Sequence, residues 1–232
     1  MEKITKILIF FAWLIFFIIN IGVAVYLIVI ANGYRIDWEN FKIEKTGIIY
    51  LKSTPNDVNI YIDNKIVGDK TPFKYQEVLP GRYSVSISGY NRQDWQGYFV
   101  VEPGIVSSKE KIVLFLKKPE EMPLSNEDVT YFEKNKNNEN SKSLIIKNNS
   151  EIYSSDKLVT RFSESVKKAV WYPDYNHIVF QVDKELRVME VDGSNNIKLL
   201  NLESADPIEL VFSDQGRIII LKDDILKKFK IS

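Results

Sequence analysis

One candidate pair for acid–base chemistry stands out in this chain of 232 residues. Its single histidine, His177, stands three positions after Asp174, close enough to form an acid–base pair. Imidazole titrates near neutral pH and is therefore the side chain most often used for proton transfer. A lone histidine just before a strand is more commonly a turn or surface residue, and we favour that interpretation. We therefore expect a protein that is not an enzyme and has no catalytic residues.

Motifs for metal, nucleotide or covalent chemistry are absent from the sequence. There is no cysteine, which excludes disulfides, thiolate metal sites and cysteine nucleophiles. There is also no Gly-x-Ser-x-Gly turn, no His-Glu-x-x-His helix and no phosphate-binding glycine loop. The segment Asp192-Gly193-Ser194-Asn195 has oxygens compatible with calcium but lacks the ligand spacing of an EF-hand, which favours a β-turn. We expect neither a metal nor a cofactor.

Four aromatic residues stand close together in the sequence and form a candidate binding surface: Tyr90, Trp95, Tyr98 and Phe99. Exposed aromatic rings can stack on sugars and peptides. The alternative is that these rings pack in a hydrophobic core, which is the commoner use of such residues.

The charge of the chain argues against one class of partner. Lysine and arginine total 31, and aspartate and glutamate also total 31, so the formal net charge is zero. Binding to nucleic acid depends on a basic surface that displaces counterions. We therefore expect no nucleic-acid partner.

An uncharged apolar segment follows a short tail, residues 1–6. As a helix, residues 7–31 would be about 37 Å long, enough to cross a bilayer core of about 30 Å. The apolar region of a cleaved signal peptide is shorter, at about 7–15 residues. In water, a helix that is apolar on all sides has nowhere to place its surface, and the length of this one argues against a buried helix of a soluble core. We therefore predict one transmembrane helix at residues 7–31, with the lipid bilayer as its partner.

The charges beside this helix do not decide its orientation. Basic residues lie on both sides, so the positive-inside rule gives no clear answer: Lys3, Lys6, Arg35, Lys42 and Lys45. The juxtamembrane segment, residues 32–46, carries aromatic residues where an interfacial belt would lie: Tyr34, Trp38 and Phe41.

Residues 47–116 have the alternating pattern of β-strands. In one run, Val58, Ile60 and Ile62 alternate with polar residues, which places one face of a strand on a core. Turn signals such as Leu79-Pro80-Gly81 separate the runs. About seven short strands in this segment predict a small β-sandwich.

The order of turn residues over residues 47–101 resembles a PEGA domain. The resemblance is carried by Ser53-Thr54-Pro55, Thr71-Pro72, Leu79-Pro80-Gly81-Arg82-Tyr83 and Gly89-Tyr90. The sequence departs from the family at Asp57, where a small residue is usual, and at Asn64, where glycine is common. The resemblance implies a sandwich without catalytic residues, exposed outside the membrane of a bacterial or archaeal cell. It therefore implies a cytoplasmic N-terminus and extracytoplasmic β-domains.

Two further segments follow. Residues 117–143 are polar and predict a mobile linker, with Val129, Tyr131 and Phe132 as an apolar exception that could dock locally. Residues 144–232 repeat a strand–turn–strand pattern at spacings of about 34 and 40 residues. Trp171-Tyr172-Pro173-Asp174 and Phe212-Ser213-Asp214 precede two of the repeats, and the pattern resembles TolB-like and WD-repeat β-propellers. Propellers use about 4–8 blades, so these repeats would form an open array or a short relative.

The sequence as a whole predicts an all-β soluble part with one N-terminal transmembrane α-helix. The β part would comprise a small β-sandwich and propeller-blade-like β-repeats. We expect an anchored, extracytoplasmic cell-envelope protein that binds or scaffolds a surface partner, either a protein or a polymer. Two alternatives remain open: a structural spacer, and an accessory or sensor subunit that docks on an envelope enzyme or secretion complex.

Overall fold

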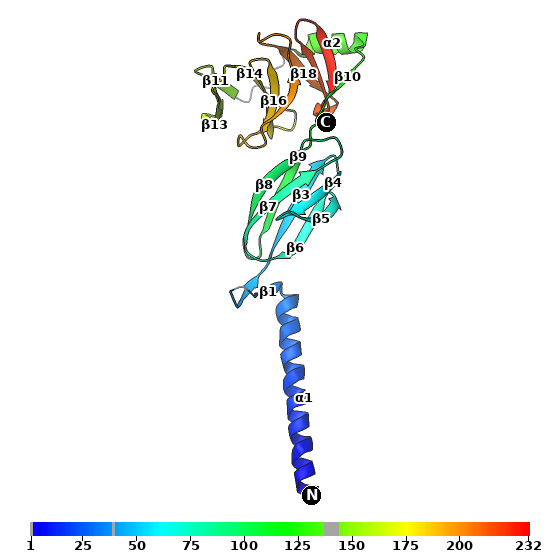
Figure 1. The fold of residues 1–232 in the computed structure, drawn as a ribbon, viewed down its shortest axis with the longest axis vertical. Coiled ribbons are helices and arrows are strands. Elements are labelled where there is room, and N and C mark those ends of the chain that lie inside the picture. The colour runs from blue at the N-terminus through cyan, green and yellow to red at the C-terminus, as the bar shows by residue number, and fades with distance from the viewer. Residues whose placement is uncertain (1, 39, 137–143) are drawn as a thin grey trace. The chain divides into compact units, whose positions relative to one another are not determined.

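The computed structural model describes residues 2–38, 40–136 and 144–232 (Figure 1). It is mostly β-sheet, with one long N-terminal helix, α1 (Glu2–Ala31). The chain divides into two compact units. The first unit comprises Met1–Leu51, Phe73–Ser84 and Tyr98–Ser108, and the second comprises Lys52–Pro72, Val85–Gly97 and Lys109–Ser232.

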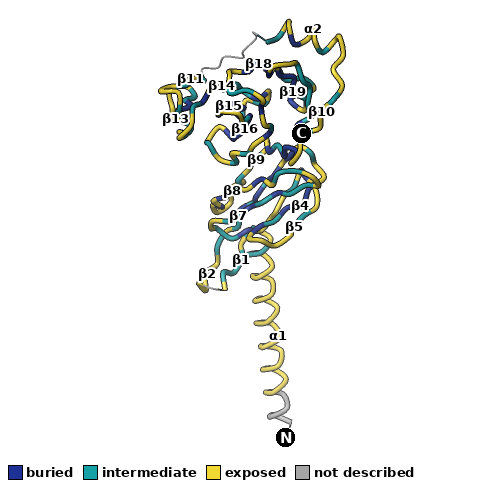
Figure 2. The backbone as a smooth tube through the Cα atoms, turned by 45° about the horizontal axis from the view of Figure 1, so that its top comes forward, coloured by how far each residue is buried: buried dark blue, intermediate teal, exposed yellow. Residues whose placement is uncertain are grey.

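Helix α1 contains an apolar span, Ile7–Ala31, none of which is buried (Figure 2). Its one amide side chain, Asn20, donates a hydrogen bond of 2.8 Å to the carbonyl oxygen of Phe16. That bond satisfies part of the amide within the helix, as an apolar surrounding requires. The span is 25 residues long, and a helix of that length and composition can cross a membrane.

A small hairpin follows α1. It consists of β1 (Tyr34–Asp37) and β2 (Lys42–Lys45), which pair antiparallel in a two-stranded sheet. Gly33, with φ of +80°, turns the chain between helix and hairpin. Its carbonyl oxygen accepts hydrogen bonds from the backbone N–H and the hydroxyl of Thr46, at 2.8 and 2.9 Å. These bonds close the base of the hairpin.

Seven strands come next, the number that the alternating pattern predicted. They form two sheets, with strand orders β6-β3-β9 and β5-β4-β7-β8. Buried and exposed residues alternate along β3, where Ile49 and Leu51 are fully buried. The strands are β3 (Gly47–Thr54), β4 (Asp57–Ile62), β5 (Lys65–Lys70), β6 (Phe73–Val78), β7 (Gly81–Ser88), β8 (Trp95–Val101) and β9 (Val106–Val113).

The turn between β4 and β5 explains one departure from the PEGA pattern. Asp63 and Asn64 have φ values of +47° and +63°, and both are left-handed. Two-residue hairpin turns of this kind accept asparagine as well as glycine, because the short polar side chain tolerates the left-handed region. Asn64 therefore keeps the turn that glycine usually makes.

Residues 117–136, predicted as part of a mobile linker, are structured. They contain β10 (Glu120–Met122), which pairs with β20, and α2 (Asn126–Asn135). A capping box between Ser125 and Asp128 begins α2, and the buried side chain of Phe132 packs against Val211 and Ile220. Of the three apolar residues that could dock locally, Phe132 is the buried one. The remaining residues of that prediction, 137–143, lie outside the described residues.

The distal strands form three antiparallel sheets in chain order. The first two have the orders β11-β12-β13 and β14-β15-β16-β17, and the third is β10-β20-β19-β18. The described ranges contain no sheet that closes into a ring, so a propeller stays a prediction. The strands are β11 (Leu144–Lys147), β12 (Glu151–Ser154), β13 (Lys157–Arg161), β14 (Val166–Trp171), β15 (His177–Val182), β16 (Glu185–Glu190), β17 (Ile197–Asn201), β18 (Glu209–Ser213), β19 (Ile218–Lys222) and β20 (Leu226–Lys230).

The attachment of α2 should depend on pH. Both carboxylate oxygens of Asp128 lie 2.9 Å from Nζ of Lys228. Hydrogen bonds from Lys228 and Ser125 lower the pKa of Asp128 from 3.8 to about 2. A carboxyl whose pKa is lower in the folded protein stabilises the fold above its unfolded pKa, and this stabilisation is lost as pH falls through the folded pKa. The free energy of unfolding should therefore fall between about pH 4 and pH 2.

Denaturant unfolding of the detergent-solubilised protein across this pH range measures the effect. Asp128→Asn should cost about 1 kcal/mol at neutral pH, as loss of a helix cap does, and should show a weaker decline in acid. Glu127→Gln, an exposed acid in the same turn, is the matched control. Parallel declines for the wild type and Asp128→Asn would contradict the role given to Asp128.

Candidate functional site

The structure separates the four aromatic residues that were predicted to form a binding surface. Tyr90 and Tyr98 are 98% and 69% exposed, whereas Trp95 and Phe99 are only 5% and 7% exposed. The separation follows from β8, in which residues 95 and 99 share one face and residue 98 lies on the other. A buried ring cannot stack on a ligand, so the predicted four-residue surface is not formed. The exposed ring of Tyr98 instead lies 4.3 Å from the guanidinium carbon of Arg82.

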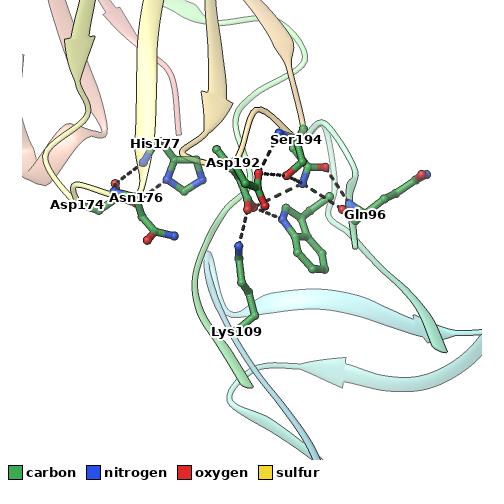
Figure 3. A network of polar contacts seen from close by, with 10 residues as sticks. Gln96, Lys109, Asp174, Asn176, His177, Asp192 and Ser194 are labelled. Atoms are coloured by element: carbon green, nitrogen blue, oxygen red, sulfur yellow. Dashed lines mark hydrogen bonds and ion pairs between the residues drawn. The ribbon is translucent and has the colours of Figure 1, made fainter. Parts of the chain in front are cut away.

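His177, expected to be a turn or surface residue, lies at a turn but is buried and not on the surface. It is 2% exposed, and Nδ1 lies 2.6 Å from Oδ2 of Asp174 (Figure 3). The other oxygen of Asp174 accepts hydrogen bonds from the backbone N–H groups of Asn176 and His177, at 2.7 and 3.1 Å. The pair therefore holds the turn that leads into β15.

Aromatic rings enclose this histidine. The ring centroids of Phe115 and Tyr172 lie 5.9 and 5.8 Å from that of His177, both edge-on. Burial raises the pKa of the Tyr172 phenol to about 12, so the phenol is neutral at physiological pH. A neutral phenol and aromatic rings therefore surround the His177–Asp174 pair. The hydrogen bonds of Asp174 support the turn.

A buried carboxylate, Glu190, lies at the end of β16 and is 1% exposed. The indole N–H of Trp95 donates to its Oε1 at 2.5 Å, and the ammonium group of Lys109 contacts Oε2. The amide of Asn195 lies 3.5 Å from Oε1. A buried carboxylate without partners would cost several kcal/mol, so these contacts fix Trp95 and Lys109 to β16 within the second unit.

The turn after β16 adds to the same network. Oδ1 of Asp192 accepts hydrogen bonds from the N–H and the hydroxyl of Ser194, at 2.9 and 2.6 Å. Gly193 has φ of +84°, which confirms the predicted turn. Asn195 exchanges two hydrogen bonds with the backbone of Gln96, at 3.1 and 3.0 Å. In the part of the chain that the structure describes, no group of three or more His, Cys, Asp or Glu residues could hold a metal ion.

The second unit contains a cavity of about 350 Å³ between β14, β18 and α2. We call it the aromatic pocket, because rings from three separate segments line it together with one lysine: Tyr131, Trp171, Tyr172, Tyr175, Phe212 and Lys136. Strands β14 and β18 are each at the edge of a sheet, so the pocket lies where two sheets adjoin.

Local structure fixes the rings of the aromatic pocket. Trp171 ends β14, and its ring centroid lies 6.3 Å from that of Tyr175. Tyr175 is 42% exposed and has φ of +55°, which turns the chain after the strand. The hydroxyl of Tyr131 donates to the carbonyl oxygen of Phe212 at 2.9 Å, so α2 closes one side. Nζ of Lys136 lies 2.9 Å from a carboxylate oxygen of Glu133.

Sequence reasoning missed the aromatic pocket as a site, although a signal for it was present. Trp171 and Phe212 precede acidic turns at equivalent places in successive repeats. Trp171 in β14 and Phe212 in β18 line the same pocket, because the two strands lie beside it. The partners of Glu190 left no comparable signal, because Trp95 lies 95 positions away in the chain.

The fold and these sites define a mostly β-sheet protein with one N-terminal helix that is long and apolar enough to span a membrane. Residues 46–97, about a fifth of the chain, match the PEGA domain family. This match confirms the resemblance over the first β segment. No curated protein matches the chain. The PEGA domain and the apolar helix together fit a membrane-anchored extracellular protein.

Removing the Glu190 carboxylate should destabilise the second unit. Glu190→Ala leaves the Lys109 ammonium and the Trp95 indole without their acceptor, which should cost about 3–5 kcal/mol. Glu190→Gln should cost less, because the amide oxygen can still accept from the indole. Urea unfolding in mild detergent, followed by tryptophan fluorescence, measures both changes.

Glu185→Gln is the matched control. Glu185 lies in the same strand, is 36% exposed and pairs with Arg187 and Lys198. Loss of such an exposed pair should cost less than about 1 kcal/mol. If Glu190→Ala proved no more damaging than this control, the network around Glu190 would not fix the segments as described.

Proposed function

We propose that this chain is a single-pass cell-envelope protein with a cytoplasmic N-terminus and extracytoplasmic β-sheets. Its distal sheets bind a surface partner, protein or polymer, without catalysis. The observation that carries the proposal is the aromatic pocket of about 350 Å³ in the second unit. Pockets with aromatic walls and a few polar groups are typical of ligand-binding sites.

The chemistry of the pocket supports binding over proton transfer. The hydroxyl of Tyr131 is engaged by a backbone carbonyl, and the Tyr172 phenol stays neutral at physiological pH. The ring of Tyr175 is partly exposed, whereas Trp171 and Phe212 are half-buried and so held in place. Rings held in this way favour stacking on a sugar or on an apolar side chain.

The proposed architecture follows from the sheets. We infer that β3–β9 form a PEGA-type β-sandwich, because their sheets have strands that alternate between buried and exposed residues. We also infer that the distal sheets are successive blades of an incomplete propeller. They are antiparallel, they follow one another in the chain, and the first strands of two of them line one pocket.

One alternative has an observation in its favour. The strands β14 and β18 are sheet edges, and a sheet edge is where another chain can add a strand. This favours an accessory subunit that docks on an envelope enzyme or secretion complex. A structural spacer, the other alternative, would leave the aromatic pocket without a ligand.

Retention of envelope fractions by the immobilised full-length protein tests the proposal. The fractions are the purified wall polymer and detergent-extracted envelope proteins of the source cell. Tyr175→Asn removes a pocket ring and preserves the left-handed backbone, because asparagine tolerates positive φ. We expect it to weaken retention of the bound component roughly threefold to tenfold, the value of one aromatic contact.

Tyr90→Ala is the matched control, because it removes a ring that is 98% exposed and does not line the pocket. It should retain as much of the component as the wild type. If no fraction were retained, the spacer would be favoured. Equal losses in Tyr90→Ala and Tyr175→Asn would place binding elsewhere.

A further inference from the structure

The hairpin of β1 and β2 has one apolar face and one charged face. Directly opposed residues of an antiparallel pair share a face, and Ile36 lies opposite Ile43. Tyr34 extends this apolar face toward the helix, opposite Lys45. The other face carries two cross-strand pairs of opposite charge, Arg35 with Glu44 and Asp37 with Lys42. The hairpin is therefore amphipathic, and its charged face is electrically balanced.

The apolar side of this hairpin is only partly covered, with Ile36 half-buried. Ile43 is 61% exposed, and the tip residues Trp38 and Phe41 are 72% and 83% exposed. No third strand joins the hairpin, which forms a two-stranded sheet. An isolated hairpin of two strands is only marginally stable in water. Such a hairpin needs another apolar surface against its exposed face.

A cleft of about 280 Å³ separates the hairpin from the last turns of α1. We call it the helix–hairpin cleft. Its hairpin wall contains Tyr34, Arg35, Ile36, Trp38 and Ile43, of which Arg35 alone is charged, and its helix wall runs from Ile30 back to Gly22. A Cβ atom added at Gly22 would meet no atom within 4 Å. Gly22 lies about 13 Å along the axis from the end of α1, so the cleft extends to hydrocarbon depth when the helix spans a bilayer.

We propose that this hairpin is a lipid-binding part of the anchor. An acyl chain of a bilayer phospholipid occupies the helix–hairpin cleft, while Trp38 and Phe41 lie among the headgroups. The inference rests on the membrane anchor of the proposed function and holds for either orientation of α1.

Continuity with the membrane-spanning surface identifies the occupant. The helix wall of the cleft belongs to the span Ile7–Ala31, whose exposed apolar surface meets lipid in a bilayer. That span is about 37 Å long against a hydrocarbon core of about 30 Å, so one end reaches the headgroup region. Tryptophan and other aromatic residues are favoured at that depth.

The balanced charges on the hairpin determine the choice of lipid for a test. Arg35 forms an ion pair with Glu77 in addition to facing Glu44 across the hairpin. Because these charges are matched, binding of the acyl chain does not require an anionic headgroup. Vesicles of phosphatidylcholine with brominated acyl chains are therefore the probe, since bromine quenches only the tryptophans that it approaches.

The full chain has four tryptophans, and Trp13 lies within the apolar span. In Trp13→Phe, Trp38 should be the tryptophan that bromine quenches, with a fluorescence loss of up to about a third. The double variant Trp13→Phe/Trp38→Phe should show no such loss. Gly22→Phe, added to Trp13→Phe, fills the cleft and should reduce the quenching of Trp38, whereas Ala12→Phe, lower on the helix, should not.

Each outcome decides the matter. If bromine quenched Trp13 in Trp38→Phe but did not quench Trp38 in Trp13→Phe, then protein or water, and not lipid, would contact the hairpin. If Gly22→Phe left the quenching of Trp38 unchanged, the acyl chain would not occupy the cleft. If Trp13 in Trp38→Phe also escaped quenching, the anchor itself would fail, which separates that failure from failure of the hairpin proposal.

Discussion

The apolar surface of α1 is the constraint on which the rest of the structure depends. The 25 residues from Ile7 to Ala31 carry no charge, and none of them is buried by the protein. Water solvates such a surface poorly, while a bilayer solvates it and requires only that the helix satisfy its own backbone, as α1 does. The β-sheets therefore build their own cores, and the hairpin β1–β2 is the first element that follows the apolar span.

A buried charge network organises the second unit. Glu190 accepts from the indole of Trp95 and pairs with Lys109, while Asn195 binds the backbone of Gln96. Buried ion pairs are often weak contributors to net stability, but breaking one is costly, which makes them effective at specifying one arrangement. The network therefore fixes β16 and its turn to the segments around Trp95 and Lys109. The residues that line the aromatic pocket take no part in it.

Much of the fold could be predicted from the sequence, because its signals are local. Uncharged length predicted α1, and alternation with turn residues predicted the strands β3–β9. Helix α2 itself was not predicted, although the local docking of Phe132 was, because one buried ring anchors an otherwise polar segment. For Trp95, Tyr98 and Phe99 the sequence left a surface and core packing open, and alternation along β8 buries Trp95 and Phe99 and exposes Tyr98. The contacts of Glu190 join residues far apart in the chain, and composition and periodicity do not report such pairs.

The central claim is an anchor with its β-sheets outside the cytoplasm, and single-cysteine labelling tests it most directly. The chain has no cysteine, so Tyr90→Cys creates one site, at a position that is 98% exposed. Lys3→Cys, in the tail before the helix, is the matched control. A membrane-impermeant maleimide added to intact cells should label Tyr90→Cys at once and Lys3→Cys only after lysis. Labelling of Lys3→Cys on intact cells, with Tyr90→Cys protected until lysis, would contradict the account.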